Sequence, residues 1–183
     1  LIVLPTDTVY GLGCGVFSVS GIKTIYHLKG RETEKAIAVL LADLEQIDMV
    51  AGPCLPGTYH LVERFLPGPL TLVVKKQPGL PVELSTLPTV GIRIPNHPFT
   101  RALLRACGPM AVTSANLSGH PSSTNITEVI KQFGELIPMI IDGGQSPGGQ
   151  SSTVVDCTSE EPRILREGPI SITDIQKVWF QKY

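Results

Sequence analysis

Apolar and polar residues alternate along the chain in blocks whose lengths suit strands and helices in turn. The continuous apolar run at residues 37–41 has the length and composition of a strand that is buried on both faces. Ahead of it, Ile22 and Ile25 belong to a set of apolar residues at helical spacing. That periodicity predicts a helix capped by Ser20 and ended by Gly30.

The same reading applied to the whole chain predicts strands and helices in alternation. The predicted strands cover residues 1–4, 37–41, 70–74, 90–94, 110–113, 139–141, 153–156 and 163–166. The predicted helices cover residues 20–29, 43–50, 58–66, 98–106, 127–133 and 172–180. This order indicates an α/β fold with a mixed, largely parallel sheet flanked by helices.

Polar loops follow several of the predicted strands. Residues 6–13 are expected to form a polar turn, residues 77–89 an exposed proline-rich loop, residues 114–124 a loop rich in hydroxyl groups, and residues 142–149 a mobile loop. Ligands bind outside the strand ends of open α/β sheets, so we expect polar residues from these loops to meet in one cleft. The residues expected there are Thr6, Lys29, Arg93, Ser114, Ser152 and Arg166.

Length and composition favour one globular domain. The chain has 183 residues, of which 42% are hydrophobic, enough to bury a sizeable core within a single domain spanning residues 1–183. It opens on the apolar run at residues 1–4, as though within a strand, so we expect a few native residues to precede it.

The balance of charges excludes a strong overall electrostatic field. The chain has 15 Lys and Arg residues and 16 Asp and Glu residues, so any site for an anion must be local. The four cysteines form no C-x-x-C pair, and neither they nor the four histidines have the spacing of metal ligands, so we expect no protein-built metal site. Neither a membrane-spanning run of about 18 apolar residues nor a signal peptide is visible, and a reducing cytoplasm is the expected location.

Familiar catalytic motifs are missing from the sequence. It contains neither G-x-x-x-x-G-K-[ST] nor G-x-G-x-x-G, so a phosphate site must be built in another way. Ser114 and Ser118 lie near His97 and His120, but the G-x-S-x-G elbow of a serine hydrolase is absent. The hydroxyl groups are better explained as hydrogen-bonding partners of a ligand.

Lys29, Gly30 and Arg31 form a charged turn directly after the first predicted helix. A compact ammonium and a planar guanidinium on one turn suit a polyanion such as a nucleoside triphosphate. The alternative is a solvated helix end followed by a glycine stop. In the same way, Arg93 could serve only as an ion-pair partner, and residues 116–119 could form only an ordinary loop.

Six motifs taken together separate these alternatives. They are Pro-Thr-Asp-Thr-Val-Tyr-Gly-Leu at 5–12, Lys-Gly-Arg at 29–31, Pro-Gly-Pro-Leu-Thr at 67–71, Gly-Ile-Arg-Ile-Pro at 91–95, Ser-Ala-Asn-Leu-Ser-Gly at 114–119 and Ser-Thr-Val-Val-Asp at 152–156. In this order and spacing the chain resembles the YrdC-like family of single-domain threonylcarbamoyl-AMP synthases. The resemblance implies a twisted mixed sheet, with helices around a large, positively charged cavity.

The resemblance also implies a nucleotidyltransferase reaction. L-Threonine, bicarbonate and ATP, the last with Mg²⁺, would give threonylcarbamoyl-AMP and pyrophosphate, the first step toward threonylcarbamoyladenosine in tRNA. Implied partners are the proteins that transfer the threonylcarbamoyl group, and tRNA or double-stranded RNA; no membrane is implied. Two alternatives stay open: a carbamoyl-adenylate-forming relative, and a double-stranded RNA-binding or ribosome-associated module.

Site residues follow from the resemblance by position. The implied threonine contacts are Thr6, Arg93 and Ser152. The implied nucleotide contacts are Lys29, Thr33, Thr89, Asn116, Thr124 and Arg166. The implied catalytic residues are Lys29, Arg31, Ser114 and Asn116, which would act by positioning and charge stabilisation, without a covalent enzyme intermediate.

Overall fold

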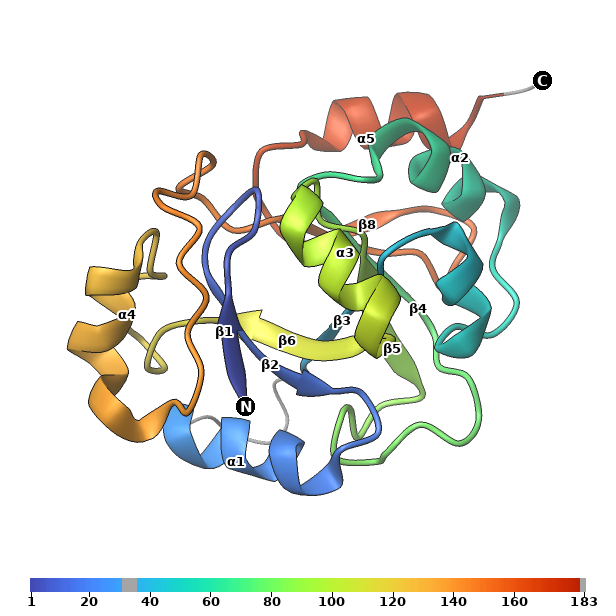
Figure 1. Ribbon diagram of the computed structural model, residues 1–183. Helices are drawn as coiled ribbons and strands as arrows, with labels where there is room; N and C mark the ends of the chain where they lie inside the picture. The colour runs from blue at the N-terminus through green and yellow to red at the C-terminus, as the bar shows by residue number, and fades with distance from the viewer. Residues whose placement is uncertain (31–35, 182–183) are drawn as a thin grey trace.

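A computed structural model describes residues 1–30 and 36–181 of the chain (Figure 1). The strands are β1 (Ile2–Leu4), β2 (Gly11–Gly15), β3 (Ala38–Leu40), β4 (Leu70–Lys75), β5 (Thr89–Arg93), β6 (Met110–Ser114), β7 (Thr153–Asp156) and β8 (Arg163–Arg166). The α-helices are α1 (Val19–Lys29), α2 (Pro56–Phe65), α3 (Pro98–Cys107), α4 (Ile126–Phe133) and α5 (Ile172–Trp179). Short 3₁₀ helices span Leu44–Met49 and Gly134–Leu136. The predicted α/β class is confirmed.

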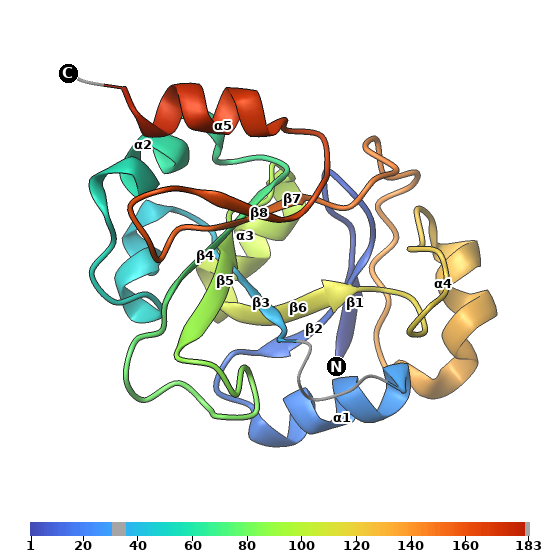
Figure 2. The same ribbon diagram turned by 180° about the vertical axis from the view of Figure 1, so that it is seen from behind.

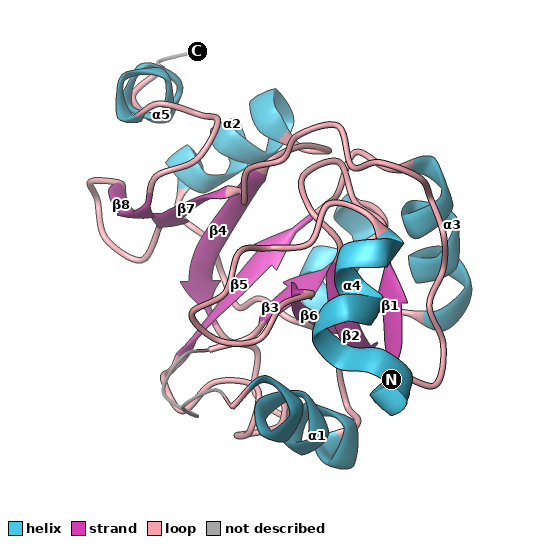
Figure 3. Cartoon of the chain, turned by 90° about the vertical axis from the view of Figure 1, so that its left-hand side faces the viewer, coloured by secondary structure: helices cyan, strands magenta, loops and turns pink. Residues whose placement is uncertain are grey.

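The described strands form one twisted sheet in the order β1-β2-β6-β3-β5-β4-β7-β8, which Figure 3 shows from the side. Two neighbouring pairs, β3 with β5 and β4 with β7, are parallel, and the other five described pairs are antiparallel. The sheet is therefore mixed, as expected, but the expectation that it is largely parallel is wrong. Continuous apolar runs suggested parallel strands because such strands are usually buried on both faces. Here antiparallel strands carry buried apolar residues on both faces and acquire the same pattern.

Alternation along the strands divides the apolar residues between two faces of the sheet. Val39, Leu72, Ile92 and Ala111 belong to the main core. Leu40 and Val112, each next in sequence to one of these, belong instead to a smaller cluster on the opposite face. This smaller cluster packs under α3, which lies across the sheet in Figure 1. Its buried members are Leu4, Leu40, Ala42, Leu104, Met110 and Val112.

Helices α1, α2 and α5 lie at the ends of the fold. Seen from in front and from behind, α1 lies at one end and α2 and α5 lie together at the other (Figures 1 and 2). Helix α5 comes so close to α2 that a Cβ built on Gly57 would lie 2.4 Å from the ring of Trp179. The absence of a side chain at Gly57 is therefore what permits the close contact between these helices.

The prediction of a polar turn at residues 6–13 is wrong for residues 11–13, because Gly11–Gly15 form β2. Glycine is unfavourable in strands, which is why the sequence suggested a turn. On the neighbouring strand, Val112 occupies the space that side chains would need: a Cβ at Gly11 would lie 2.6 Å, and one at Gly13 2.8 Å, from its methyl groups. The two glycines therefore make room for a larger residue opposite.

Three local predictions also differ from the structure. The cap of α1 is Ser18, whose hydroxyl accepts from the Gly21 N–H, and not Ser20. The helix predicted at residues 43–50 is a 3₁₀ helix that carries no side-chain hydrogen bond at its N-cap. The strand predicted at residues 139–141 contributes only an isolated bridge between Ile140 and Val3. Each error lies at the boundary of a helix or in a short segment, where local sequence determines structure least.

Burial separates the four cysteines by reactivity. Burial raises the pKa of the Cys14 thiol to about 11 and that of Cys157 to about 12, and it also raises the pKa of Cys54. Cys107, at the end of α3, is exposed. Thiolates react and thiols do not. We therefore expect a maleimide at pH 8 to label Cys107 of the native protein at least about 100-fold faster than the other three cysteines.

Mass spectrometry of the labelled protein measures this, with Cys107→Ser as the control that should lose the fast reaction. Fast labelling of Cys14 or Cys157 in the native protein would contradict the burial described above.

Candidate functional site

A cavity of about 370 Å³ opens on the sheet face that carries the smaller apolar cluster. Five neighbouring strands contribute alternate residues to it, because side chains two apart on a strand point to the same face. The strand residues that line it include Ala38, Leu40, Thr71, Val73, Gly91, Arg93, Val112 and Ser114, together with Val154. The volume lies within the range of small-molecule sites, about 300–1,000 Å³.

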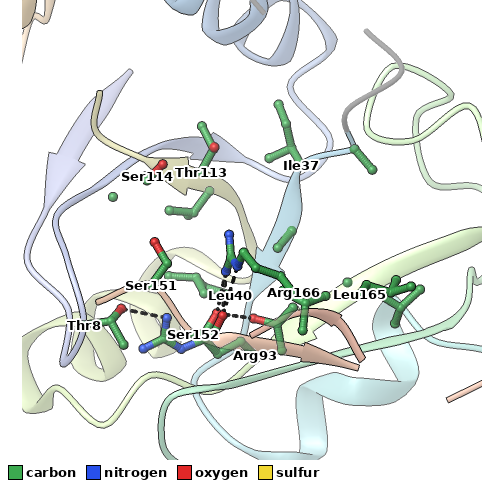
Figure 4. Close-up of a pocket in the computed structure, with 18 of the residues that line it drawn as sticks. Thr8, Ile37, Leu40, Arg93, Thr113, Ser114, Ser151, Ser152, Leu165 and Arg166 are labelled. Atoms are coloured by element: carbon green, nitrogen blue, oxygen red, sulfur yellow. Dashed lines mark hydrogen bonds between the residues drawn. The ribbon is translucent and has the colours of Figure 1, made fainter. Parts of the chain in front are cut away.

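Arg93 lies buried at one end of this cavity, beside Thr8 and Ser152 (Figure 4). Its Nη2 donates to Asp7 Oδ1 at 2.5 Å, its Nη1 to Thr8 Oγ1 at 2.9 Å, and its Nε to the Gly68 carbonyl at 3.0 Å. Burial lowers the pKa of Arg93, while the charge of Asp7 raises it, and an arginine stays protonated in proteins. A guanidinium has five N–H donors, so two remain without a partner among the described residues.

The hydroxyl of Thr6 is already saturated within its own turn. It donates to the Val9 carbonyl at 2.7 Å, accepts the Thr8 N–H at 3.1 Å, and lies 3.0 Å from the Thr8 hydroxyl. Because the Thr6 proton is used on Val9, Thr8 is the donor of that last bond. Thr8 Oγ1 also accepts from Arg93 and keeps one lone pair. Of the two threonines, Thr8 is therefore the one whose hydroxyl can bind a ligand.

Ser152 and Thr71 form a second pair of buried hydroxyls, 2.8 Å apart. The guanidinium of Arg166 makes three hydrogen bonds to Ser152, from Nη2 to Oγ at 3.1 Å and from Nε and Nη2 to the carbonyl at 3.1 and 2.8 Å. Figure 4 shows Arg166, from β8, beside Ser152. Ser152 is thereby linked both to Thr71 on β4 and to Arg166 on β8.

The end of β6 and the turn that follows it lie across the cavity from Arg93, with Thr113 and Ser114 on the opposite side in Figure 4. Beneath the turn lies Lys29, which is only 2% exposed and whose Nζ donates to the carbonyls of Ser114 and Asn116. The solvated helix end considered above is therefore wrong for Lys29. The helix stop is correct, since Gly30 adopts the left-handed conformation with φ 56°.

Asn116 is buried beside Lys29 but is not among the lining residues. Its side-chain N–H₂ donates to the carbonyls of Leu117 at 2.8 Å and His120 at 2.9 Å, which is ordinary loop chemistry. Its Oδ1, however, is buried without a hydrogen-bond partner in the described part of the chain. A buried acceptor left unpaired is costly, and this oxygen keeps its capacity to accept a hydrogen bond.

Residues 142–151 form a strap that crosses the turn containing Thr8. The Tyr10 hydroxyl accepts the Gly143 N–H at 3.0 Å and donates to the Gly144 carbonyl at 2.7 Å, and burial raises the pKa of that hydroxyl. Farther along, the Gly149 N–H donates to the Thr8 carbonyl at 3.0 Å. The strap is thus hydrogen-bonded at several points along the segment expected to be a mobile loop.

The structure brings six of the predicted site residues to the cavity lining: Thr6, Thr89, Arg93, Ser114, Ser152 and Arg166. Lys29 and Asn116 lie directly behind it, as described above. Thr124 is not in the lining; its hydroxyl and N–H bind Glu128 at the start of α4. Arg31 and Thr33 lie outside the described residues.

Sequence reasoning did not assign three residues of the site. Asp7, Thr8 and Thr71 stand inside recognised motifs but received no role. Thr71 could have been found, because it is the single polar residue in the apolar run at residues 70–74, and alternation places it on one face with Val73.

The charges around the cavity come from few residues. In the lining that the structure describes, Arg93 and Arg166 are charged and no side chain is acidic. The positive character of the whole cavity stays a prediction. Across residues 1–30 and 36–181 no group of three or more His, Cys, Asp and Glu could hold a metal ion. In the same part of the chain, no helix has the length and apolar character of a membrane span.

Fold and site together define an α/β protein whose ligand cavity is the open face of a twisted mixed sheet. The chain matches the Sua5_yciO_yrdC family model, described as "Telomere recombination", over residues 1–168, and it belongs to that family. The threonylcarbamoyl-AMP synthase of Bacillus subtilis is 39% identical over 181 residues, covering 97% of this chain and 52% of the relative.

Solved structures show the same similarity. Pyrococcus abyssi Sua5 complexed with L-threonine has a TM-score of 0.94 and 38% identity, over 97% of this chain and 53% of that one. Escherichia coli YciO has a TM-score of 0.86 and 28% identity, over 95% of this chain and 85% of that one. The chain therefore spans about half the length of the B. subtilis and P. abyssi proteins.

The buried pair between Asp7 and Arg93 yields a prediction about stability. Both side chains are nearly inaccessible, at 11% and 8% exposure. Removing one partner of a buried pair leaves the other charge uncompensated, at a cost of about 3–5 kcal/mol. We expect Asp7→Asn to lower the free energy of unfolding by about 3 kcal/mol, measured by urea denaturation.

Glu83→Gln is the matched control, because its partner Lys23 is 66% exposed and stays hydrated. We expect little change in the urea midpoint of that variant. Equal urea midpoints for the two variants would show that the Asp7–Arg93 pair contributes no more to stability than the exposed Lys23–Glu83 pair.

Proposed function

We propose that this chain is a threonylcarbamoyl-AMP synthase. It joins L-threonine and bicarbonate into a carbamate and transfers the adenylyl group of ATP to it, with release of pyrophosphate and water. The observation that carries the proposal is the cavity end built by Arg93, Thr8 and Ser152, in a fold with a TM-score of 0.94 to a Sua5 structure complexed with L-threonine. This is nucleotidyl transfer, and the relatives named as synthases support an enzyme.

The proposed amino-acid end matches each polar group of threonine to an available partner. Arg93 offers its two remaining N–H donors to the carboxylate, in the paired geometry that a guanidinium favours. Thr8 offers its lone pair to the amine N–H, which remains a donor after the carbamate forms. Thr6 contributes by fixing Thr8 rather than through its own saturated hydroxyl.

The proposed nucleotide end is the rest of the cavity. Arg166, which is hydrogen-bonded to Ser152 at the boundary between the two ends, supplies positive charge there, with Thr89 and Ser114 as hydrogen-bonding residues of the lining. Lys29 holds the Ser114–Asn116 turn from behind through its two carbonyl contacts, and it keeps a buried positive charge near the reacting phosphate. We keep Asn116, Arg31, Thr33 and Thr124 as proposed nucleotide contacts, Asn116 on the strength of its unpaired Oδ1.

In the proposed reaction a carbamate oxygen attacks the α-phosphorus in line, and the bond to pyrophosphate breaks. No side chain needs to form a covalent bond, so the work of the protein is positioning and charge stabilisation. Positioning alone can lower a barrier by about 7–11 kcal/mol. A cavity whose walls come from several strands suits that role because strands hold side chains more rigidly than loops do.

Magnesium enters this proposal as part of the substrate MgATP. Protein sites for Mg²⁺ usually supply one or two carboxylates, and the described lining has none. The residues present therefore do not fit a resident magnesium site, and we assign them no step that depends on the metal.

The product would carry the threonylcarbamoyl group to proteins that modify tRNA. A mixed carbamic–phosphoric anhydride is labile in water, so its consumer is expected to take it up promptly. We keep tRNA and these transferase proteins as proposed partners, and the cytoplasm as the proposed location.

Two alternatives differ from the main proposal in what they require. The nucleotide-bound HypF structure has 19% identity and a TM-score of 0.78, a likeness that extends to the fold alone. A carbamoyl-adenylate-forming relative would cleave ATP without L-threonine. A double-stranded RNA-binding module would bind RNA in a strongly salt-dependent way and cleave no ATP.

The central prediction concerns substrate dependence. We expect pyrophosphate release, followed by a coupled phosphate assay, only when ATP, L-threonine and bicarbonate are all present. Omission of any one should reduce the rate to background, because each supplies atoms of the product. Release without L-threonine, or none with all three, would contradict the proposed function.

A second prediction concerns Arg166. Its hydrogen bonds to a phosphate would be charge-assisted, worth about 1.5–3 kcal/mol, so Arg166→Gln should raise the KM for ATP about tenfold or more. Arg163→Gln is the matched control on the same strand: Arg163 is 74% exposed, pairs with Asp156 and does not line the cavity. Equal KM values for the two variants would remove Arg166 from the nucleotide end.

A further inference from the structure

The hydroxyls of Thr71 and Ser152 have one proton more than their own hydrogen bonds use. Each hydroxyl carries one proton, and the single bond between the two oxygens uses one of them. Arg166 can only donate, so Ser152 Oγ is an acceptor in its bond with Nη2. The other hydroxyl proton has no acceptor among the described residues, and both side chains line the cavity.

Two arrangements of these protons are possible. In the first, Arg166 donates to Ser152, Ser152 donates to Thr71, and Thr71 presents the last proton to the cavity. In the second, Ser152 accepts from both neighbours and presents its own proton. The first is a head-to-tail chain that begins at a cation, and such chains polarise each successive bond and strengthen it. Thr71 is then the donor at the end of the chain.

The position of Thr71 places that donor beside Arg93. In the antiparallel pair β4 and β5, Leu72 is opposite Ile92, which puts Thr71 across from Arg93. The methyl group of Thr71 points toward Gly91, where its Cγ2 lies 3.2 Å from the position of a built Cβ. Its hydroxyl is directed toward Ser152 instead, and is 2.8 Å from it. A ligand carboxylate on Arg93 would therefore have the Thr71 hydroxyl close by.

We propose that Thr71 is a specificity-determining residue, whose hydroxyl donates to the side-chain hydroxyl of L-threonine at the end of the Arg166–Ser152–Thr71 chain. The inference rests on the proposed function. With the carboxylate on the two remaining N–H groups of Arg93 and the amine on Thr8, the side-chain hydroxyl is the polar group of the substrate still without a partner. The proton that ends the chain is a donor that no hydrogen bond among the described residues uses.

This arrangement discriminates against valine, which has a methyl group in place of the hydroxyl. Bound valine would leave the last proton of a buried chain without an acceptor, and sites built to bind a hydroxyl reject analogues that lack it strongly. We expect the wild-type chain to prefer L-threonine over L-valine by at least about 100-fold in kcat/KM.

The test compares Thr71→Val, Thr71→Ser and Ser152→Ala by pyrophosphate release and by calorimetric titration with L-threonine. Thr71→Val should raise the KM for L-threonine at least about tenfold, reduce the preference over L-valine to below about tenfold, and leave the KM for ATP unchanged. Thr71→Ser keeps the hydroxyl and should stay within about threefold of the wild type. Ser152→Ala should have a smaller effect than Thr71→Val, because Thr71 keeps its own proton.

Thr24→Val is the matched control, an exposed threonine on α1 that bonds only the Ser20 carbonyl among the described residues. Wild-type preference in Thr71→Val would overturn the inference while the proposed function stands. An equal loss for threonine and valine would assign the Thr71 proton to the carboxylate, and a larger loss in Ser152→Ala than in Thr71→Val would assign the donor to Ser152; either result overturns the inference. A wild-type chain that neither binds L-threonine nor cleaves ATP would overturn the function and the inference together.

Discussion

The buried guanidinium of Arg93 is the interaction on which the site depends. A cation removed from water must be compensated, and Arg93 receives three partners from two separate segments: Asp7 and Thr8 after β1, and Gly68 before β4. Its place on β5 gives it a fixed direction. Because two N–H donors remain in a cavity, the same group that joins these segments can also bind an anionic ligand.

The turn at residues 6–8 derives its role from this arrangement. The hydrogen bonds of Thr6 fix the direction of the Thr8 hydroxyl, and the strap at residues 142–151 covers the turn from outside. Close approach of the strap requires Gly148, where a Cβ would lie 2.7 Å from the Asp7 carbonyl. Tyr10 then holds the beginning of the strap by two hydrogen bonds. The walls of the cavity thus come from segments more than 130 residues apart in the chain.

Much of the fold could be predicted from the sequence. Periodicity located the long helices and most strands, and glycine and proline located the turns, because these are local effects of side-chain shape. Prediction failed at β2, where three glycines form a strand because Val112 fills the space beside two of them. It failed again on strand direction, since a pattern of full burial is the same for parallel and antiparallel strands once both faces are covered.

For the site, the sequence by itself determined which chemical groups are present: the hydroxyl-rich turns, the cations Lys29, Arg93 and Arg166, and the family to which their order and spacing point. Only the tertiary structure decided how each group is used. It places Lys29 behind the cavity and uses every hydrogen bond that the Thr6 hydroxyl can make. It leaves one free lone pair on the Thr8 hydroxyl and ends a chain of hydrogen-bond donors at Thr71. The physical reason is that the residue type sets how many hydrogen bonds a group can donate or accept. The neighbours that form those hydrogen bonds come from distant strands, which the local sequence does not identify.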